Sequence, residues 1–429
     1  MYNYKMHLTE DEKDILNGSQ GETMAKIMKT LVMYGDTFGA DSLVDVTSDA
    51  GHLVTSFGIS LMSPVYDLMD ELLNAGIVSK QPFTVDPRPV DLENVPSNII
   101  QKLVFRFMYG KQDYYEDQLK KMGLKSKDGF SCTAYMEQVG NIPNKGDILS
   151  WAESSAVVYA NSVLGARCNR NSGIIEMFGS ILGKVPNFGL LTDKGRKASW
   201  IIEVKTGKLP EAQVLGSAIG MKVMEDVPYI KGLDKFLGNE LDGWVKDYLK
   251  DMGAATASNG AVGLYHVEGL TPEAAESGED LIAQNPSVYV IDDAELQRVK
   301  DSYPVIWKDP DARPKLCFIG CPHLSLRQLK DWTNRIEEGL KKAGKTKVLI
   351  PTVLTAASPV LKEFNELPEA KVLKRLGVST SYICPLMFMN NPTCGKMPVI
   401  TNSNKLRTYT TSRYYTDDEI VSVITEGRQ

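Results

Sequence analysis

The chain has 429 residues, 43% of them hydrophobic and 24% charged, which is ordinary for a globular protein and long enough for two or three core-forming units. Its formal net charge of −6 argues against nucleic acid as a main partner. There is no secretory signal pattern and no apolar run of about 18 residues, so we expect no membrane span and a cytoplasmic protein with reduced cysteines.

The first half of the chain is predicted to be mostly helical. Thr9 and Glu12 have capping-box spacing, so a short helix should begin there and end near Gly18. Apolar residues at helical spacing predict helices over 24–32, 68–73 and 96–124, whereas the three prolines in 81–95 indicate an extended segment or loop. A helix over about 152–160 leads into a polar, glycine-punctuated loop at 165–173, and residues 174–183 are again helical.

The last third alternates strands and helices. Buried strands are predicted at 315–320, 347–350 and 381–384, with helices over 325–344 and 357–376 between them. This order predicts an α/β fold with a parallel sheet and right-handed crossovers. Ligands of such sheets bind beyond the carboxyl ends of the strands.

Three cysteines lie in loops beside predicted strands or helices: Cys132, Cys321 and Cys384. Cys321 and Cys384 both fall at carboxyl ends of strands in the predicted sheet, which favours a shared site. Three soft sulfur ligands at one point could hold an iron–sulfur cluster or a zinc ion, and a site one ligand short keeps a position open for substrate. No C-x-x-C pair is present, so the spacing is not that of a ferredoxin or a zinc ribbon. The alternative is that these cysteines are simply buried core residues.

Polar residues form three further candidate groups. The first group lies in the helix predicted at about 152–160 and in the polar loop after it, and comprises Glu153, Ser154, Ser155, Asn161, Arg167, Asn169 and Arg170. Its arginine side chains suit bidentate binding of a carboxylate or phosphate. The alternative is that this is a solvated charged loop. His52 lies among small polar residues that suit a pocket, although a structural role is equally consistent. Thr401, Asn402 and Ser403 follow an apolar run and form either an anion cradle or an ordinary turn.

These segments together resemble the aconitase X family over essentially the whole chain. The resemblance rests on residues 131–135, on the long run 151–167, on 320–323 and on 401–403. It implies an aconitase-like catalytic core of parallel and mixed sheets flanked by helices. We expect two or three α/β lobes within 1–429, with a parallel-sheet lobe near 285–429 and without the family's swivel domain. A small swivel-domain subunit would then be the partner.

The resemblance also implies a reaction. We expect a hydro-lyase large subunit whose Cys132, Cys321 and Cys384 hold an iron–sulfur cluster or a mononuclear iron. Its substrate would be a small hydroxy acid, with cis-3-hydroxy-L-proline as the main expectation and mevalonate 5-phosphate as the alternative. Besides the cysteines, two sets of residues are expected at the site. The catalytic candidates are Glu153, Ser154, Ser155 and His52. The substrate-binding candidates are Asn161, Arg167, Asn169, Arg170, Thr401, Asn402 and Ser403. A non-catalytic iron–sulfur or zinc protein is the alternative from another class.

Overall fold

The helices expected at the start of the chain form a first lobe. In the computed structural model, which describes residues 4–427, Thr9 and Glu12 form the capping box of α1 (Glu10–Leu16). The elements of this lobe are α2 (Glu22–Phe38), β1 (Leu43–Asp45), β2 (Gly51–Leu53), α3 (Ser63–Asn74), β3 (Phe83–Val85), α4 (Ile99–Met108), α5 (Gln112–Met122), α7 (Gly173–Leu182) and β4 (Lys184–Pro186). The helix predicted over 96–124 is therefore two helices, and Gly110, a poor helix former, lies at the break.

A second lobe is built on a four-stranded parallel sheet in the order β7-β6-β5-β8. Its strands are β5 (Ala198–Val204), β6 (Pro228–Lys231), β7 (His266–Val267) and β8 (Ile282–Ile291), and its helices are α8 (Ala212–Val223), α9 (Asp234–Leu237), α10 (Gly243–Asn259), α11 (Pro272–Ser277) and α12 (Asp293–Asp301). α6 (Ser154–Ser162) packs on α10. Because β8 pairs with β5, residues 282–301 belong to this lobe, and the third lobe begins after them rather than near 285.

The third lobe contains the predicted parallel sheet, five strands in the order β11-β10-β9-β12-β13. They are β9 (Leu316–Ile319), β10 (Thr352–Thr355), β11 (Val378–Ser381), β12 (Val399–Thr401) and β13 (Arg413–Tyr414). The helices are α13 (Leu326–Lys342), α14 (Ser358–Asn365), α15 (Pro368–Arg375), α16 (Pro385–Met389), α17 (Asn404–Tyr409) and α18 (Asp417–Glu426). The predicted α/β fold with parallel sheets flanked by helices is confirmed.

Three boundaries in this lobe were predicted wrongly. The strand expected at 347–350 is β10, which begins at Thr352, because Val348 and Leu349 donate their N–H groups to carbonyls outside the sheet. The strand expected at 381–384 is β11, which ends at Ser381, so residues 382–384 lie beyond the end of the strand. The helix expected over 357–376 is divided into α14 and α15, since a proline starts the second helix.

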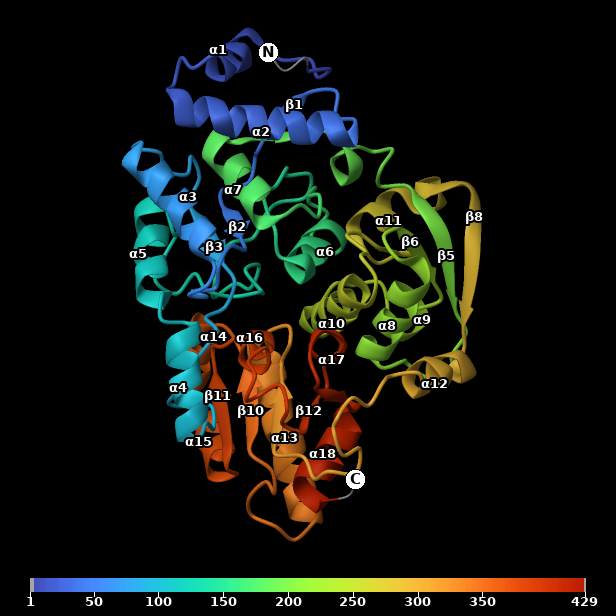
Figure 1. Ribbon diagram of the computed structural model, residues 1–429. Helices are drawn as coiled ribbons and strands as arrows, with labels where there is room; N and C mark the ends of the chain where they lie inside the picture. Colours follow the sequence, from blue (N-terminus) through green and yellow to red (C-terminus); the bar gives the residue numbers. More distant parts are fainter. Residues whose placement is uncertain (1–3, 428–429) are drawn as a thin grey trace.

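The three lobes meet at the centre of the molecule. Figure 1 shows α6, α10, α16 and α17 facing this region from different lobes, and α17 contacts both α10 and α16. Within residues 4–427, no helix combines the length and the apolar character that a membrane crossing requires.

Candidate active site

The segments that carry Cys132, Cys321 and Cys384 come together where the lobes meet. Cys321 lies two residues beyond β9, and Cys384 caps α16 three residues beyond β11, so both stand at the carboxyl edge of the parallel sheet, as expected. Gly320 makes the turn before Cys321 with a φ of +105°, and a Cβ there would lie 2.6 Å from the carbonyl oxygen of Thr355. This turn therefore requires glycine.

His323 ties the three cysteine segments to one another. Its backbone N–H lies 3.4 Å from Cys132 Sγ, and its Nε2 lies 3.0 Å from the carbonyl oxygen of Ile383, next to Cys384. A carbonyl only accepts, so Nε2 carries the proton and Nδ1 faces the Ser131 hydroxyl at 3.4 Å. Burial lowers the pKa of His323 to about 4, which keeps the ring neutral in this arrangement.

The three thiols influence one another electrostatically. Burial raises the pKa of all three, that of Cys384 to about 12, and the proximity of Cys321 raises the pKa of both Cys132 and Cys384 further. Within the described chain, no three His, Cys, Asp or Glu side chains converge on a position for a single metal ion. The donor chemistry of three sulfurs from three segments fits the expected iron–sulfur group.

Beside the cysteines lies a buried ion pair between Glu153 and Lys405. Glu153 caps α6, and its Oε2 accepts a hydrogen bond from the Ser155 hydroxyl at 2.7 Å, while Oε1 pairs with the Lys405 ammonium group. Lys405 Nζ also lies 3.2 Å from the Ser155 hydroxyl. Burial opposes the charge of Lys405, but Glu153, Cys321 and Cys132 together raise its pKa above the ordinary value, so it is a cation directed at the cysteines.

His52 and Asp86 add a pair of buried polar atoms without partners. His52 Nδ1 lies 2.8 Å from the Thr84 hydroxyl, which leaves Nε2 to face Asp86 Oδ1 at 3.7 Å. Neither of these two atoms has a hydrogen-bond partner within the described residues. Burial lowers the pKa of His52 to about 4, whereas burial and the charge of Glu153 raise the pKa of Asp86 well above its usual range. An unpaired buried donor and acceptor are costly unless a ligand engages them.

Among the expected substrate-binding residues Asn161, Arg167, Asn169 and Arg170, only the Arg170 side chain is influenced electrostatically by Glu153. Its guanidinium is near enough to Glu153 and Tyr409 for their charges to act on its pKa, which burial lowers from the ordinary value. Nη1 is buried without a hydrogen-bond partner, while Nη2 lies 3.4 Å from the carbonyl oxygen of Ala257. Its stem packs against Gly263, where a Cβ would approach within 3.0 Å of Cδ.

The other three candidates, Asn161 of α6 and Arg167 and Asn169 of the loop after it, have structural partners instead. The side-chain amide of Asn161 forms hydrogen bonds with backbone groups of Cys168 and Gly263, and that of Asn169 forms hydrogen bonds with backbone groups of Phe188 and Leu190. Arg167 forms an ion pair with the exposed Asp193. The structure does not bring these three to the cysteine site.

The Thr401–Ser403 segment positions the site and is not an open cradle. Ser403 caps α17 and donates its hydroxyl to the carbonyl oxygen of Cys321, which links Cys321 to the helix that carries Lys405. The hydroxyl of Thr401 accepts from the N–H of Ser403 at 3.1 Å, and the Asn402 amide donates to Asp417 at 2.9 Å. Ser154 is the first residue of α6 and is half-buried.

Lys405 follows Ser403 by two residues, and the sequence indicated it only as the lysine of a possible anion cradle, not as a partner of Glu153. Asp86 was not predicted as a site residue. Asp86 directly follows the three-residue strand β3, at the carboxyl end of a parallel pair, but the prolines around it indicated only a loop.

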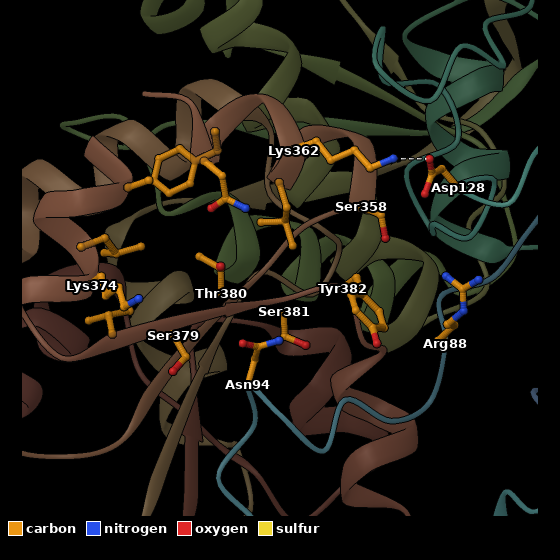
Figure 2. A pocket seen from close by; sticks show the side chains of 16 residues that line it. Arg88, Asn94, Asp128, Ser358, Lys362, Lys374, Ser379, Thr380, Ser381 and Tyr382 are labelled. Atoms are coloured by element: carbon orange, nitrogen blue, oxygen red, sulfur yellow. Dashed lines mark hydrogen bonds and ion pairs between the residues drawn. The ribbon is translucent and has the colours of Figure 1, made fainter. Parts of the chain in front are cut away.

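A separate cavity of about 600 Å³ lies at the open edge of β11. Figure 2 shows it lined by hydroxyls of β11 and α14, with Arg88 and Tyr382 at one side and an ion pair between Lys362 and Asp128 above. None of the three cysteines lines it. One of its lining residues, Arg88, accepts a hydrogen bond from the N–H of Cys384 through its carbonyl at 2.8 Å, so the cavity adjoins the segment that carries Cys384.

Comparison with known proteins identifies the family. Residues 5–194 match the model of the aconitase X first domain, and residues 198–301 match that of the second. The chain is 32% identical to the phosphomevalonate dehydratase large subunit of Thermococcus kodakarensis, over 86% of each chain. The chain belongs to the aconitase X family. The sequence-based identification is thus confirmed, together with the expectation of a hydro-lyase, since the relatives are dehydratases.

Other relatives and a solved structure agree with this family assignment. The chain is 34% identical to the phosphomevalonate dehydratase large subunit of Methanosarcina mazei, over 76% of this chain and 74% of that one. It is 26% identical to the cis-3-hydroxy-L-proline dehydratase of Pseudomonas aeruginosa, over 73% of this chain but 51% of that one. The crystal structure of Thermococcus kodakaraensis aconitase X in its holo form matches 98% of this chain and all of its own, with a TM-score of 0.79 and 29% identity.

Proposed function

We propose that this chain is the large subunit of a phosphomevalonate dehydratase, which removes water from mevalonate 5-phosphate. The observation that carries the proposal is the match over 86% of both chains to a relative of that name. Relatives named cis-3-hydroxy-L-proline dehydratase are less similar, and this chain spans about half of their length. The comparisons therefore favour the alternative of the sequence analysis over its main expectation, cis-3-hydroxy-L-proline.

We assign the cofactor to the three cysteines. Cys132, Cys321 and Cys384 would hold an iron–sulfur cluster, which when bound would supply Lewis acidity at the carbon–oxygen bond that breaks. The neutral His323 holds the three segments in register through its bonds to Ser131 and Ile383. Its role is positional, because both ring nitrogens already face protein groups.

The remaining polar groups bind and orient the substrate. Arg170 offers a buried N–H without a partner, which suits the carboxylate or phosphate of an anionic substrate. His52 Nε2 and Asp86 Oδ1 offer a second contact for a substrate hydroxyl. Lys405, held by Glu153 and Ser155, places a positive charge where negative charge develops on the departing oxygen. Glu153 and Ser155 thus act through Lys405, and the base that takes the carbon-bound proton would come from a small partner subunit.

The proposal is tested with the chain purified without oxygen together with its small subunit. Iron and acid-labile sulfide are measured first, and dehydration of mevalonate 5-phosphate and of cis-3-hydroxy-L-proline is then assayed side by side. We expect iron with sulfide and turnover of mevalonate 5-phosphate alone. Turnover of only the proline derivative would overturn the substrate assignment, and zinc in place of iron would overturn the cofactor assignment.

A further inference from the structure

The outward face of α4 is unusually apolar for a surface. Ile99, Ile100, Leu103 and Phe107 are 86%, 66%, 68% and 71% exposed. Residues 99, 103 and 107 are spaced four apart, so they form one stripe along the helix. Contiguous exposed apolar side chains of this size mark interaction surfaces in folded proteins.

The opposite face of α4 is firmly packed on the wall of the active site. The Phe105 ring packs against that of Phe388 in α16 in a tilted arrangement, with ring centroids 5.0 Å apart, and the Tyr109 hydroxyl donates to the carbonyl oxygen of Met387 at 2.8 Å. Because α16 is capped by Cys384, the apolar stripe is displayed by a helix that borders the cysteine site. Figure 1 shows α4 on the flank of the molecule, with no element outside it in this view.

Hollows on both sides extend the surface. A hollow of about 740 Å³ at the start of α4 is lined by Ile100, Met397, Lys315 and Lys396, among others, and by no acidic residue. A smaller one of about 360 Å³ lies towards its end, beside Phe105. Near that end, Ser60 donates both its N–H and its hydroxyl to the carbonyls of Met108 and Phe107, which brings the 80% exposed Leu61 to the same surface.

The charged residues on α4 and in the larger hollow are all positive, whereas the smaller hollow also contains Asp113. α4 contains Lys102 and Arg106 and no acid, and Lys315 and Lys396 line the adjoining hollow. None of these four cations forms an ion pair within residues 4–427. The local charge is thus opposite to the net charge of −6 of the whole chain. A matching occupant would present an apolar surface with acidic residues around it.

We propose that the α4 surface, defined as Leu61, Ile99, Ile100, Leu103 and Phe107 with its four cations, docks the small partner subunit through an apolar patch with an acidic rim. This rests on the proposed function for the partner's existence, since relatives of this chain are named large subunits. Because α4 packs against α16, and α16 begins at Cys384, a partner bound to α4 would lie next to the cysteine site. A second copy of the chain is disfavoured because a two-fold contact would oppose like charges, and a membrane offers no protruding side chains for the two hollows.

The test compares two double variants of the iron-loaded chain. Leu103→Asp with Phe107→Asp places acids on the stripe, whereas Val288→Asp with Val290→Asp alters exposed valines on β8, in another lobe. Each is mixed with the small subunit and followed by sedimentation velocity. We expect the α4 variant to raise the Kd at least ~100-fold and the β8 variant to change it less than ~3-fold. Retained iron and an unchanged circular dichroism spectrum establish that both variants are folded.

Three outcomes would overturn this docking surface: equal affinity of the α4 variant and the wild type, self-association of the wild type that the α4 variant abolishes, or binding to vesicles of anionic phospholipid that the α4 variant abolishes. The dehydration assay separates this inference from the proposed function. An active complex that forms equally well with the α4 variant leaves the function intact and removes the docking surface. A complex that needs α4 but does not act on mevalonate 5-phosphate leaves the docking surface and removes the substrate assignment.

Discussion

Two buried clusters of charge in this molecule differ in how completely their hydrogen bonds are used. Around Arg196, which is 1% exposed, the guanidinium donates to both oxygens of Glu273 at 2.7 and 2.9 Å, and further to Asn161 and the Leu190 carbonyl. Around Glu153 and Lys405, by contrast, the neighbouring His52, Asp86 and Arg170 each keep a buried atom without a partner.

This difference indicates a structural role for the Arg196 cluster and a ligand-binding role for the Glu153–Lys405 cluster. A buried cation whose donors are all engaged stabilises the junction of segments it contacts and has nothing left for a ligand. A buried site with unused donors and acceptors carries a desolvation cost that a bound substrate removes. Residue type alone does not distinguish the two, because each cluster contains an arginine and a carboxylate.

The largest expected effect is that of removing a cysteine from the site. We expect Cys321→Ser to lose both bound iron and dehydratase activity to background, because serine is a poor ligand for iron–sulfur groups. Cys317→Ser is the matched control: Cys317 is buried in β9, and burial alone, without a contribution from another thiol, raises the pKa of its thiol. It should lower stability by about 1–3 kcal/mol and keep its iron. An active Cys321→Ser enzyme with full iron content would refute the ligand assignment.

Breaking the Glu153–Lys405 pair should harm both activity and stability. For Lys405→Met we expect kcat/KM to fall roughly 10²–10³-fold. We also expect the free energy of unfolding to fall by about 3–5 kcal/mol, because Glu153 is left buried and unpaired. Adding Glu153→Gln should recover much of the stability, measured by urea unfolding, without recovering turnover. Recovery of activity in the double variant would make the pair purely structural.

Removing Arg196 should affect stability alone. We expect Arg196→Met to lower the free energy of unfolding by about 3–5 kcal/mol, since Glu273 loses its partner, while kcat and KM of the folded enzyme stay within about two-fold. The matched variant Arg167→Met breaks an ion pair with an 85% exposed aspartate and should cost less than about 1 kcal/mol. A specific rise in KM for either variant would place that arginine at the substrate.

Glu176 provides an effect on stability that depends on pH and leaves the proposed active site untouched. It is buried with only neutral partners, Ser150 and Asn171, and burial raises its pKa from near 4.5 to about 8. The folded state therefore keeps a proton that the unfolded state loses, and stability falls as pH rises between these values. Relative to wild type, Glu176→Gln should gain roughly 2–4 kcal/mol between pH 5 and pH 8, as measured by urea unfolding. A difference that is constant over this range would show that the carboxyl is not protonated.

The sequence by itself determined much of the local structure and the position of two of the three candidate cysteines at the edge of the sheet. Capping boxes and apolar spacing indicated α1, α7 and α13 because these signals involve residues only a few positions apart. Strand–helix alternation predicted the parallel sheet and put Cys321 and Cys384 at its carboxyl edge. The resemblance in residues 151–167 and 320–323 identified the family, although not the better-supported substrate.

Only the tertiary structure decided which polar residues are free to act. Lys405 finds Glu153 across 252 positions, and Arg196 engages Glu273 across 77, so neither partnership leaves a local signal. Asn161, Arg167 and Asn169 looked suited to an anion, but the fold uses their hydrogen bonds elsewhere. Whether a buried polar atom has a partner depends on groups from distant segments, and the packing of the three lobes supplies or withholds them.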